Sequence, residues 1–400
     1  MTGRPRRGKK QNSFRLFVLL VITVVALAYI GGWVWRSRSR STSTQMQAST
    51  KGQNDASSEG VLTREDSFEG KSSTSDKETL YDISNDADEN RVKERAKAAV
   101  LGAFVADAAT MGLHWIYNTA QIQALLTTKQ KIGSPEFFEP PSCPFYKYDS
   151  GNLSPYGDEV LPLLESVVEQ GRLDPHHFSK HLFESFKKYN GRLNSASKDM
   201  VRNLESGKQF PEAGAVNDEA HSIVKASVVV ARYAGKPNLK DVMLDTIRVH
   251  QQSTDADDAG VAAALVLERI VLGQRISQAI QWALQDNHIP TSAKLWLQTA
   301  VQSKHTNAEA AVLDFGQSCH LPGSFQGPMF LASHSNGYVE AVRENIMAGG
   351  DNCSRAHFIG ALFAAQDGLD SIPDEWRQKT AIFTDLEALV DDLLERRGAL

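Results

Sequence analysis

Hydrophobic positions along most of the chain repeat at the three-to-four-residue spacing of an α-helix and do not alternate as in a strand. Between residues 160 and 168, apolar side chains at positions 160, 161, 164, 167 and 168 form one helical face. Comparable runs lie at residues 92–111, 221–233, 261–272, 339–347, 355–365 and 384–397. No fixed-period repeat is visible, which argues against a solenoid. The pattern therefore predicts a compact, multi-helix, all-α domain.

A different pattern occupies residues 16–35, where the sequence carries no charge. At about 1.5 Å per residue, a helix of this length spans a hydrocarbon core of about 30 Å. Tyr29, Trp33 and Trp35 are typical of an aromatic belt, so a retained transmembrane helix is favoured over a cleaved signal peptide. Six basic residues precede the span and three follow it closely, which predicts a single-pass protein with a cytosolic N-terminus and a lumenal or extracellular domain.

Charge divides the chain further than its formal net charge of −5 suggests. Residues 1–40 hold nine basic residues and no acidic ones, whereas residues 41–90 hold eleven acidic and four basic residues among many serines and threonines. The second stretch has too few apolar side chains to offset its ordering entropy. We therefore predict a basic segment at 1–15, a transmembrane helix at 16–35, a disordered acidic tether at 36–90 and the helical domain at 91–400.

Composition excludes several classes of protein. The domain at 91–400 has 37 acidic and 30 basic residues, so a nucleic-acid partner is not expected. Glycine and proline contents are ordinary, which excludes a collagen-like chain. The three cysteines, Cys143, Cys319 and Cys353, form no CxxC pair, so the spacing predicts neither a zinc ribbon nor a redox pair.

Two segments place an acidic side chain after a glycine, at the start of a helical run. Gly157 precedes Asp158 and Glu159, and Gly350 precedes Asp351. Aspartate at a helix start is a favoured N-cap, worth about 1 kcal/mol. Carboxylates at converging helix ends are also the oxygen ligands that Mg²⁺ prefers, and they can position water for hydrolysis. The residues alone leave both interpretations open.

These segments resemble the ADP-ribosylglycohydrolase family, including its crystallin-like and selenoprotein-related members. The resemblance extends over residues 92–368. Matching stretches occur in the family's order at residues 102–108 with 113–117, 156–159, 217–221, 249–251 and 345–355. This resemblance implies an all-α domain with a cleft for ADP-ribose and, in active members, two magnesium ions.

The resemblance also implies roles for individual residues. The catalytic residues that it implies are Asp158, Glu159 and Asp351. The Mg²⁺ ligands are Asp158, Asp351 and Ser354. The substrate-binding residues are Asp107, His114, Trp115, Asn217, Asp218, Gly350, Asn352 and Arg355.

Structural interpretations remain open for several of these residues. Asp107 is equally compatible with a polar side chain satisfied by neighbouring helix ends. Asn217 and Asp218 are also common turn residues, and Arg355 is compatible with an exposed ion pair.

The metal motif departs from the family pattern. Active members typically carry Thr-Asp-Asp-Thr and Gly-Gly-Asp-Thr-Asp-Thr, where this chain has Tyr-Gly-Asp-Glu at 156–159 and Gly-Gly-Asp-Asn-Cys-Ser at 349–354. Gly157 and Cys353 replace one aspartate each, and a thiol is a poor ligand for Mg²⁺. Two functions follow: a membrane-anchored hydrolase cleaving a glycosidic bond of ADP-ribose or a related nucleotide sugar, or a catalytically silent ADP-ribose-binding or crystallin-like structural domain.

Overall fold

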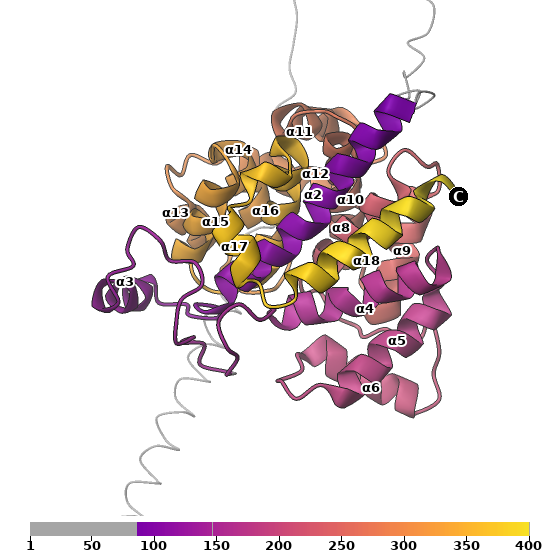
Figure 1. Cartoon of the computed structure of the whole chain (residues 1–400), viewed down its shortest axis with the longest axis horizontal. Helices are drawn as coiled ribbons and strands as arrows, with labels where there is room; N and C mark the ends of the chain where they lie inside the picture. Colours follow the sequence, from indigo (N-terminus) through magenta and orange to yellow (C-terminus); the bar gives the residue numbers. More distant parts are fainter. Residues whose placement is uncertain (1–85, 146, 400) are drawn as a thin grey trace, which may run out of the picture. The chain divides into compact units, whose positions relative to one another are not determined.

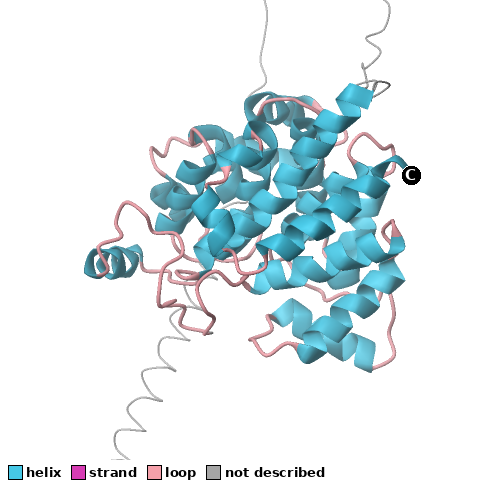
Figure 2. Cartoon of the chain, viewed as in Figure 1, coloured by secondary structure: helices cyan, strands magenta, loops and turns pink. Residues whose placement is uncertain are grey.

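A computed structural model describes residues 86–145 and 147–399. Within these ranges the chain folds into helices joined by loops and contains no strand, only isolated bridges between single residues (Figures 1 and 2). The prediction of an all-α domain is confirmed. The helices are α2 (Asp86–Met111), α3 (Thr119–Thr128), α4 (Pro155–Gln170), α5 (Pro175–Lys188), α6 (Ser195–Glu205), α7 (His221–Val224), α8 (Ala226–Tyr233), α9 (Leu239–His250), α10 (Thr254–Val271), α11 (Ile276–Gln285), α12 (Thr291–Val301), α13 (Ala308–Phe315), α14 (Gly323–His334), α15 (Tyr338–Met347), α16 (Asn352–Asp367), η1 (Leu369–Ser371), α17 (Asp374–Lys379), α18 (Phe383–Glu395) and η2 (Arg396–Ala399).

Helix α16 lies at the centre of the domain. Every residue from position 352 to position 365 is buried, including the polar side chains of Asn352, Arg355 and His357. Its neighbours include α2, α10, α14 and α15. Figure 1 shows α2 in indigo and α18 in yellow running side by side, and α2 packs against both α18 and α16.

The crossing of α2 and α16 is unusually close because each helix presents a glycine to the other. A Cβ atom added to Gly102 would lie 2.4 Å from the Cβ of Ala364 and 2.6 Å from the carbonyl oxygen of Gly360. A Cβ atom added to Gly360 would lie 2.3 Å from the carbonyl oxygen of Gly102. Real Cβ atoms do not approach backbone this closely, so the separation of the two helices depends on both glycines.

Most helical runs predicted from spacing are helices, with one correction. The run at 221–233 is interrupted at Lys225, which separates α7 from α8. The ammonium of Lys225 turns inward and donates to the carbonyl oxygen of His221 at 2.7 Å and to Glu159 at 3.0 Å. The interruption therefore coincides with a buried charged side chain that periodicity cannot reveal.

The domain begins earlier than the predicted boundary at residue 91. Helix α2 starts at Asp86, inside the segment predicted to be a disordered tether. Glu89 accepts a hydrogen bond from Nε of Arg397 at 2.7 Å, and the same buried guanidinium donates to the carbonyl oxygens of Ala231 and Ala234. This contact joins the first turns of α2 to the end of the chain.

The predicted transmembrane helix at 16–35 and the predicted basic segment lie outside the described residues, as does the tether up to residue 85. The transmembrane helix, the basic segment and the disordered tether up to residue 85 therefore stay predictions. Among residues 86–145 and 147–399, no helix has the length and apolar character required to cross a membrane.

Replacement of Gly102 by alanine should destabilise the domain by about 1–3 kcal/mol, because the added methyl group forces α2 away from α16. The measurement is urea unfolding followed by circular dichroism. Gly133→Ala is the matched control, since nothing lies within 4 Å of a Cβ atom added there. Equal unfolding midpoints for the two variants would contradict the proposed role of the crossing.

Candidate functional site

The loop after α2 and the start of α16 are joined by a short backbone bridge. The N–H of Trp115 donates to the carbonyl oxygen of Gly350 at 2.9 Å, and the N–H of Gly350 donates to that of Ile116 at 2.8 Å. Gly350 has a φ of +67°, and a Cβ atom added to it would lie 2.3 Å from the carbonyl oxygen of Gln317. Glycine is therefore required here by conformation and by space.

Asp351 follows this bridge and is fully buried among neutral donors. Its Oδ1 accepts a hydrogen bond from Nε1 of Trp115 at 2.7 Å. Its Oδ2 accepts from the hydroxyl of Tyr156 at 3.0 Å and from the hydroxyl of Ser354. Nε2 of His114 lies 3.4 Å from Oδ1. Both carboxylate oxygens are thus satisfied by protein groups.

The N-cap interpretation holds for neither aspartate. Asp351 occupies the N-cap position of α16, but its side chain makes no capping hydrogen bond. In α4 the cap is Ser154, whose hydroxyl oxygen accepts the N–H of Tyr156, while Asp158 lies inside the first turn. Neither carboxylate therefore acts as a helix N-cap, the structural role that its position in the sequence suggested.

Asp107 of α2 supports the start of α4. Its Oδ2 accepts the N–H of Ser154 at 2.7 Å, and its Oδ1 accepts the hydroxyl of the same residue at 2.5 Å. Burial raises the pKa of Asp107 to about 7, although these hydrogen bonds act in the opposite direction. A Cβ atom added to Gly157 would lie 2.6 Å from Asp107 Oδ2, so Asp107 occupies the space that a side chain at position 157 would need. These contacts match the structural interpretation of Asp107, and its contact with substrate stays a prediction.

Asp158 faces a pocket of about 440 Å³ beside α4. Its Oδ2 accepts a hydrogen bond from the hydroxyl of Tyr189 at 2.9 Å, and that hydroxyl also contacts the hydroxyl of Tyr148. Burial raises the pKa of Asp158 to about 7, against the lowering effect of the Tyr189 hydrogen bond. Lys147 and Asn152 also line the pocket. A carboxyl group that titrates near neutral pH in a pocket is typical of functional sites.

Glu159, the next residue, lies in a different environment. It is fully buried and accepts hydrogen bonds from Nδ1 of His221 at 2.8 Å and from the ammonium of Lys225 at 3.0 Å. Burial would raise the pKa of Glu159, but His221 and Lys225 hold it well below its usual range. A carboxylate with so low a pKa is a weak proton acceptor, so this geometry does not favour Glu159 as a general base.

The contacts of Glu159 extend into a buried network that includes His250 and Glu219. Lys225 donates to Nδ1 of His250 at 3.2 Å, and Nε2 of His221 lies 3.1 Å from Glu219. Burial alone would lower the pKa of His221, but Glu159 and Glu219 raise it to about 9. Two carboxylates therefore balance two buried cations, which is the condition for burying such charges at tolerable cost.

The predicted substrate-binding pair Asn217 and Asp218 lies in the loop before α7. Oδ1 of Asn217 accepts the N–H of Glu219 at 2.8 Å, which is the turn chemistry of the structural interpretation. Oδ1 of Asp218 lies 2.7 Å from Nδ1 of His320 in the loop before α14. The loop before α14 also contacts Asp351, because the N–H of Asp351 donates to the carbonyl oxygen of Gln317 at 2.8 Å.

The remaining predicted substrate-binding residues are buried. Nε of Arg355 donates to Oδ1 of Asn345 at 2.8 Å, and its NH2 group donates to the carbonyl oxygen of Gly349. Burial lowers the pKa of Arg355 to about 10. Oδ1 of Asn352 lies 3.0 Å from Nδ1 of His114. Arg355 therefore braces the glycine turn, and the exposed ion pair considered from the sequence is wrong.

The predicted Mg²⁺ ligands are brought together only in part. Ser354 contacts Asp351, whereas Asp158 bonds to Tyr189 and lines its own pocket. The groups that contact the Asp351 carboxylate, an indole N–H and two hydroxyls, bring no second carboxylate to it. Gly157 and Cys353 supply no carboxylate. The residues present do not fit a pair of magnesium ions.

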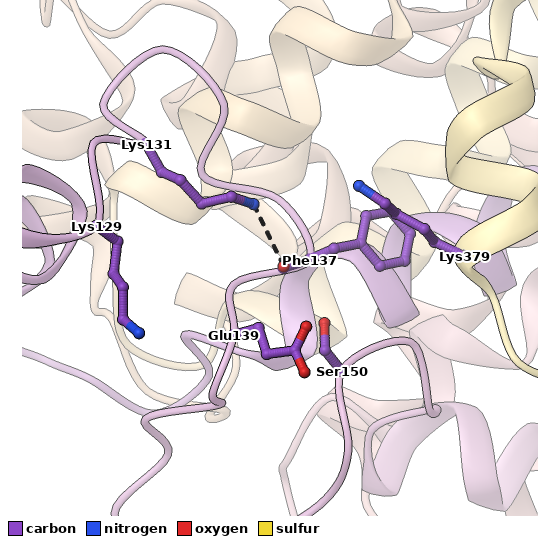
Figure 3. Close-up of a pocket in the computed structure, with 6 residues that line it drawn as sticks. All are labelled: Lys129, Lys131, Phe137, Glu139, Ser150 and Lys379. Carbon is purple, nitrogen blue, oxygen red and sulfur yellow. Dashed lines mark hydrogen bonds between the residues drawn. The ribbon is translucent and has the colours of Figure 1, made fainter.

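A second pocket, of about 410 Å³, lies away from the predicted site residues (Figure 3). Lys131 points across it and donates to the carbonyl oxygen of Phe137 at 3.4 Å. Lys379 lies over the ring of Phe137 and pairs with Glu375 at 2.6 Å. Two of the three lysines in this pocket therefore already have partners within the protein.

The residues that the structure describes form an all-helical domain, and its carboxylates Asp107, Asp158, Glu159 and Asp351 gather where α2, α4 and α16 meet. The chain belongs to the ADP-ribosylglycohydrolase family, whose family model matches residues 88–399. It is 30% identical over 308 residues to crystallin J1A of Tripedalia cystophora, covering 73% of this chain and 94% of that protein. Crystallin J1B of the same organism is 29% identical over 306 residues, covering 72% of this chain and 93% of that protein.

The fold has a solved counterpart. A structure titled as an ADP-ribosylglycohydrolase-related protein complex superposes with a TM-score of 0.56 at 19% sequence identity, covering 77% of this chain and 99% of that chain. At this identity the likeness concerns the fold. The family resemblance drawn from the motifs is confirmed by the family match and the crystallin relatives.

Several residues of the site were not identified from the sequence. Tyr189 and Tyr148 beside Asp158 follow no motif. Lys225 lies four residues after His221, a spacing that places both on one face of a helical run and could have suggested a pair. Cys319 and His320 are adjacent potential metal ligands, but nothing in the sequence brings them to Glu219.

Replacement of Asp158 by asparagine should stabilise the domain increasingly between about pH 4 and pH 7. The unfolded carboxyl group ionises near 3.8, whereas the folded one ionises near 7, so rising pH favours the unfolded wild type in this window. The difference in unfolding free energy should change by at most about 1.4 kcal/mol per pH unit and level off above pH 7.

Urea unfolding of the wild type and Asp158→Asn at pH 4.5, 6 and 8 provides the measurement. Asparagine can still accept the Tyr189 hydroxyl, so the native contact is retained. Asp392→Asn on the exposed face of α18 is the matched control and should show no comparable trend. A pH-independent difference for Asp158→Asn would refute the raised pKa.

Proposed function

We propose that this domain binds ADP-ribose or a related nucleotide sugar without hydrolysing it by the two-metal route. The observation that carries the proposal is the set of neutral donors on Asp351. Trp115, Tyr156 and Ser354 satisfy the carboxylate that the resemblance implies as a Mg²⁺ ligand. The catalytically silent alternative is thus better supported by the geometry than a magnesium-dependent hydrolase.

The pocket beside Asp158 supports the binding part of the proposal. Its volume of about 440 Å³ is in the range of small-molecule sites, about 300–1,000 Å³. Tyr148 and Tyr189 offer aromatic faces for a base, and Lys147 offers a charge for a diphosphate. Asp158 and Asn152 offer hydrogen-bond partners for ribose hydroxyls.

The relatives named crystallin J1A and J1B also support a role for this fold without catalysis. Both relatives are named crystallins, and this chain is similar to them along nearly their whole length. A purely structural role is separated from ligand binding by the titration described below.

A second candidate function is metal-independent hydrolysis with Asp158 as the acid. The supporting observation is the pKa of Asp158, raised to about 7 by burial, which suits proton donation to a glycosidic oxygen near neutral pH. Glycosidases usually need a second carboxylate, and no other carboxylate lines this pocket among the described residues. The binding function is therefore preferred.

Titration with ADP-ribose should raise the melting temperature of the full-length protein, because a ligand that binds only the folded state stabilises it by mass action. The shift should occur without Mg²⁺ and should be reduced by Tyr189→Ala. Lys379→Ala, in the second pocket, is the control and should leave the shift unchanged. No shift in the wild type at millimolar ligand would refute nucleotide-sugar binding.

The same samples test catalysis when ADP-ribosylated protein replaces free ADP-ribose. We expect no release of ADP-ribose with or without Mg²⁺. Release that requires Mg²⁺ and is lost in Asp351→Ala would restore the two-metal hydrolase. Release without metal that is lost in Asp158→Asn would favour the second candidate.

We further propose that residues 16–35 anchor the protein as a single-pass helix, with the domain on the lumenal or extracellular side. Support comes from the uncharged span and its flanking basic residues. The full-length protein should stay in the membrane pellet after alkaline carbonate extraction. In sealed vesicles of cytosolic-side-out orientation, the domain should resist added protease until detergent is present. Extraction by carbonate would contradict the anchor, and digestion before detergent would reverse the orientation.

A further inference from the structure

Three clusters of metal-ligating side chains occur within residues 86–145 and 147–399. The first, Glu159 with His221 and His250, already contains a cation, because the ammonium of Lys225 lies 3.0 Å from Glu159 and 3.2 Å from His250. This cluster has no room for a second positive charge. The second and third clusters lie nearer the surface and differ in how firmly their side chains are held in position.

The second cluster joins Glu169 of α4 to His177 and His181 of α5. Each imidazole is paired with a glutamate there: His177 with Glu169 at 3.3 Å and His181 with Glu165 at 3.2 Å. These are ordinary surface ion pairs between neighbouring helices. The cluster carries no proposal and serves below as a control.

The third cluster contains Glu219, Cys319 and His320. One ligand atom from each side chain, a carboxylate oxygen, the thiol sulfur and an imidazole nitrogen, lies within 4.8 Å of the other two. Ligand atoms around a tetrahedral zinc ion stand about 3.3–3.8 Å apart, as follows from Zn–S and Zn–N bonds of about 2.3 and 2.0 Å. The side chain of His320 is 55% exposed, so its ring can move by the small distance required.

The geometry points to a zinc site formed by Glu219, Cys319 and His320. Thiolate and imidazole ligands favour zinc over the hard cations Mg²⁺ and Ca²⁺, which prefer oxygen alone. Three protein ligands leave a fourth tetrahedral position for water or a ligand. The residues are distinct from Asp158, Asp351 and Ser354, which the family resemblance implies for magnesium.

Two contacts hold these ligands in place before any metal binds. Asp218 Oδ1 lies 2.7 Å from Nδ1 of His320, the carboxylate–imidazole pairing that orients metal-bound histidines. Glu219 accepts from Ser195 at 2.9 Å and from His221 at 3.1 Å, one bond on each oxygen, which leaves lone pairs for a metal.

The backbone also fixes the distance between the two loops that supply the ligands. Glu219 and His320 form an isolated antiparallel bridge, and the N–H of Leu321 donates to the carbonyl oxygen of Asp218 at 2.9 Å. Ligands from two separate loops are therefore held in register without the metal. Side chains that are neighbours on the surface only by chance are not held in position in this way.

Zinc titration of the full-length protein tests the proposal. The protein is purified in detergent, stripped with a chelator and kept reduced, and Zn²⁺ binding is measured by calorimetry. We expect one zinc per chain. Partners outside the ligand shell are each worth about 10–100-fold in affinity, so loss of a ligand in Cys319→Ser or His320→Ala should weaken binding at least about a hundredfold. Co²⁺ in place of zinc should give a thiolate charge-transfer band that Cys319→Ser abolishes.

Two control variants keep the outcome specific. Cys143→Ser removes a different partly buried cysteine, and His177→Ala breaks the second cluster; both should bind zinc as the wild type does. Melting curves of the metal-free variants establish that Cys319→Ser and His320→Ala remain folded. Unchanged zinc affinity in Cys319→Ser, a Co²⁺ complex without the thiolate band, or binding lost only in His177→Ala overturns the proposal.

Discussion

The close crossing of α2 and α16 is the constraint on which the site depends. Because Gly102 and Gly360 face each other, the two helices approach to backbone contact, and the ends of both are fixed relative to each other. Five residues beyond Gly102, α2 places Asp107 at the start of α4. The loop that follows delivers Trp115 to Asp351 at the start of α16. A wider crossing would separate all of these contacts at once.

The domain buries its carboxylates in three different ways. Asp351 is surrounded by neutral hydrogen-bond donors, Glu159 by cations, and Asp107 and Asp158 by surroundings that raise the pKa of each to about 7. Burying an unpaired charge costs several kcal/mol, so each carboxylate is stabilised by hydrogen bonds, paired with cations or shifted toward its neutral form. The ammonium of Lys225 neutralises the charge of Glu159, as a bound metal ion neutralises a cluster of carboxylates.

The all-α fold could be predicted from the sequence because helical periodicity is a local signal. The buried face of α4, for example, repeats this signal over several turns. The site followed less completely. Asp158 and Glu159 are both predicted catalytic residues, but adjacent helical residues point about 100° apart, so Asp158 faces the pocket and Glu159 faces His221. The approach of Glu219 to Cys319 depends on tertiary contacts between two loops about 100 residues apart, which local sequence patterns do not reveal.

The substitutions at positions 157 and 353 change what the domain requires to be stable. A carboxylate at position 157 would lie against the Asp107 side chain, and one at position 353 would replace a buried thiol that contacts the Asp107 carbonyl oxygen, so each would add a buried negative charge that a metal could neutralise. With glycine and cysteine there, neutral donors suffice, and α16 can pack without an ion. A metal at Glu219, Cys319 and His320 would instead be bound by the loops before α7 and α14.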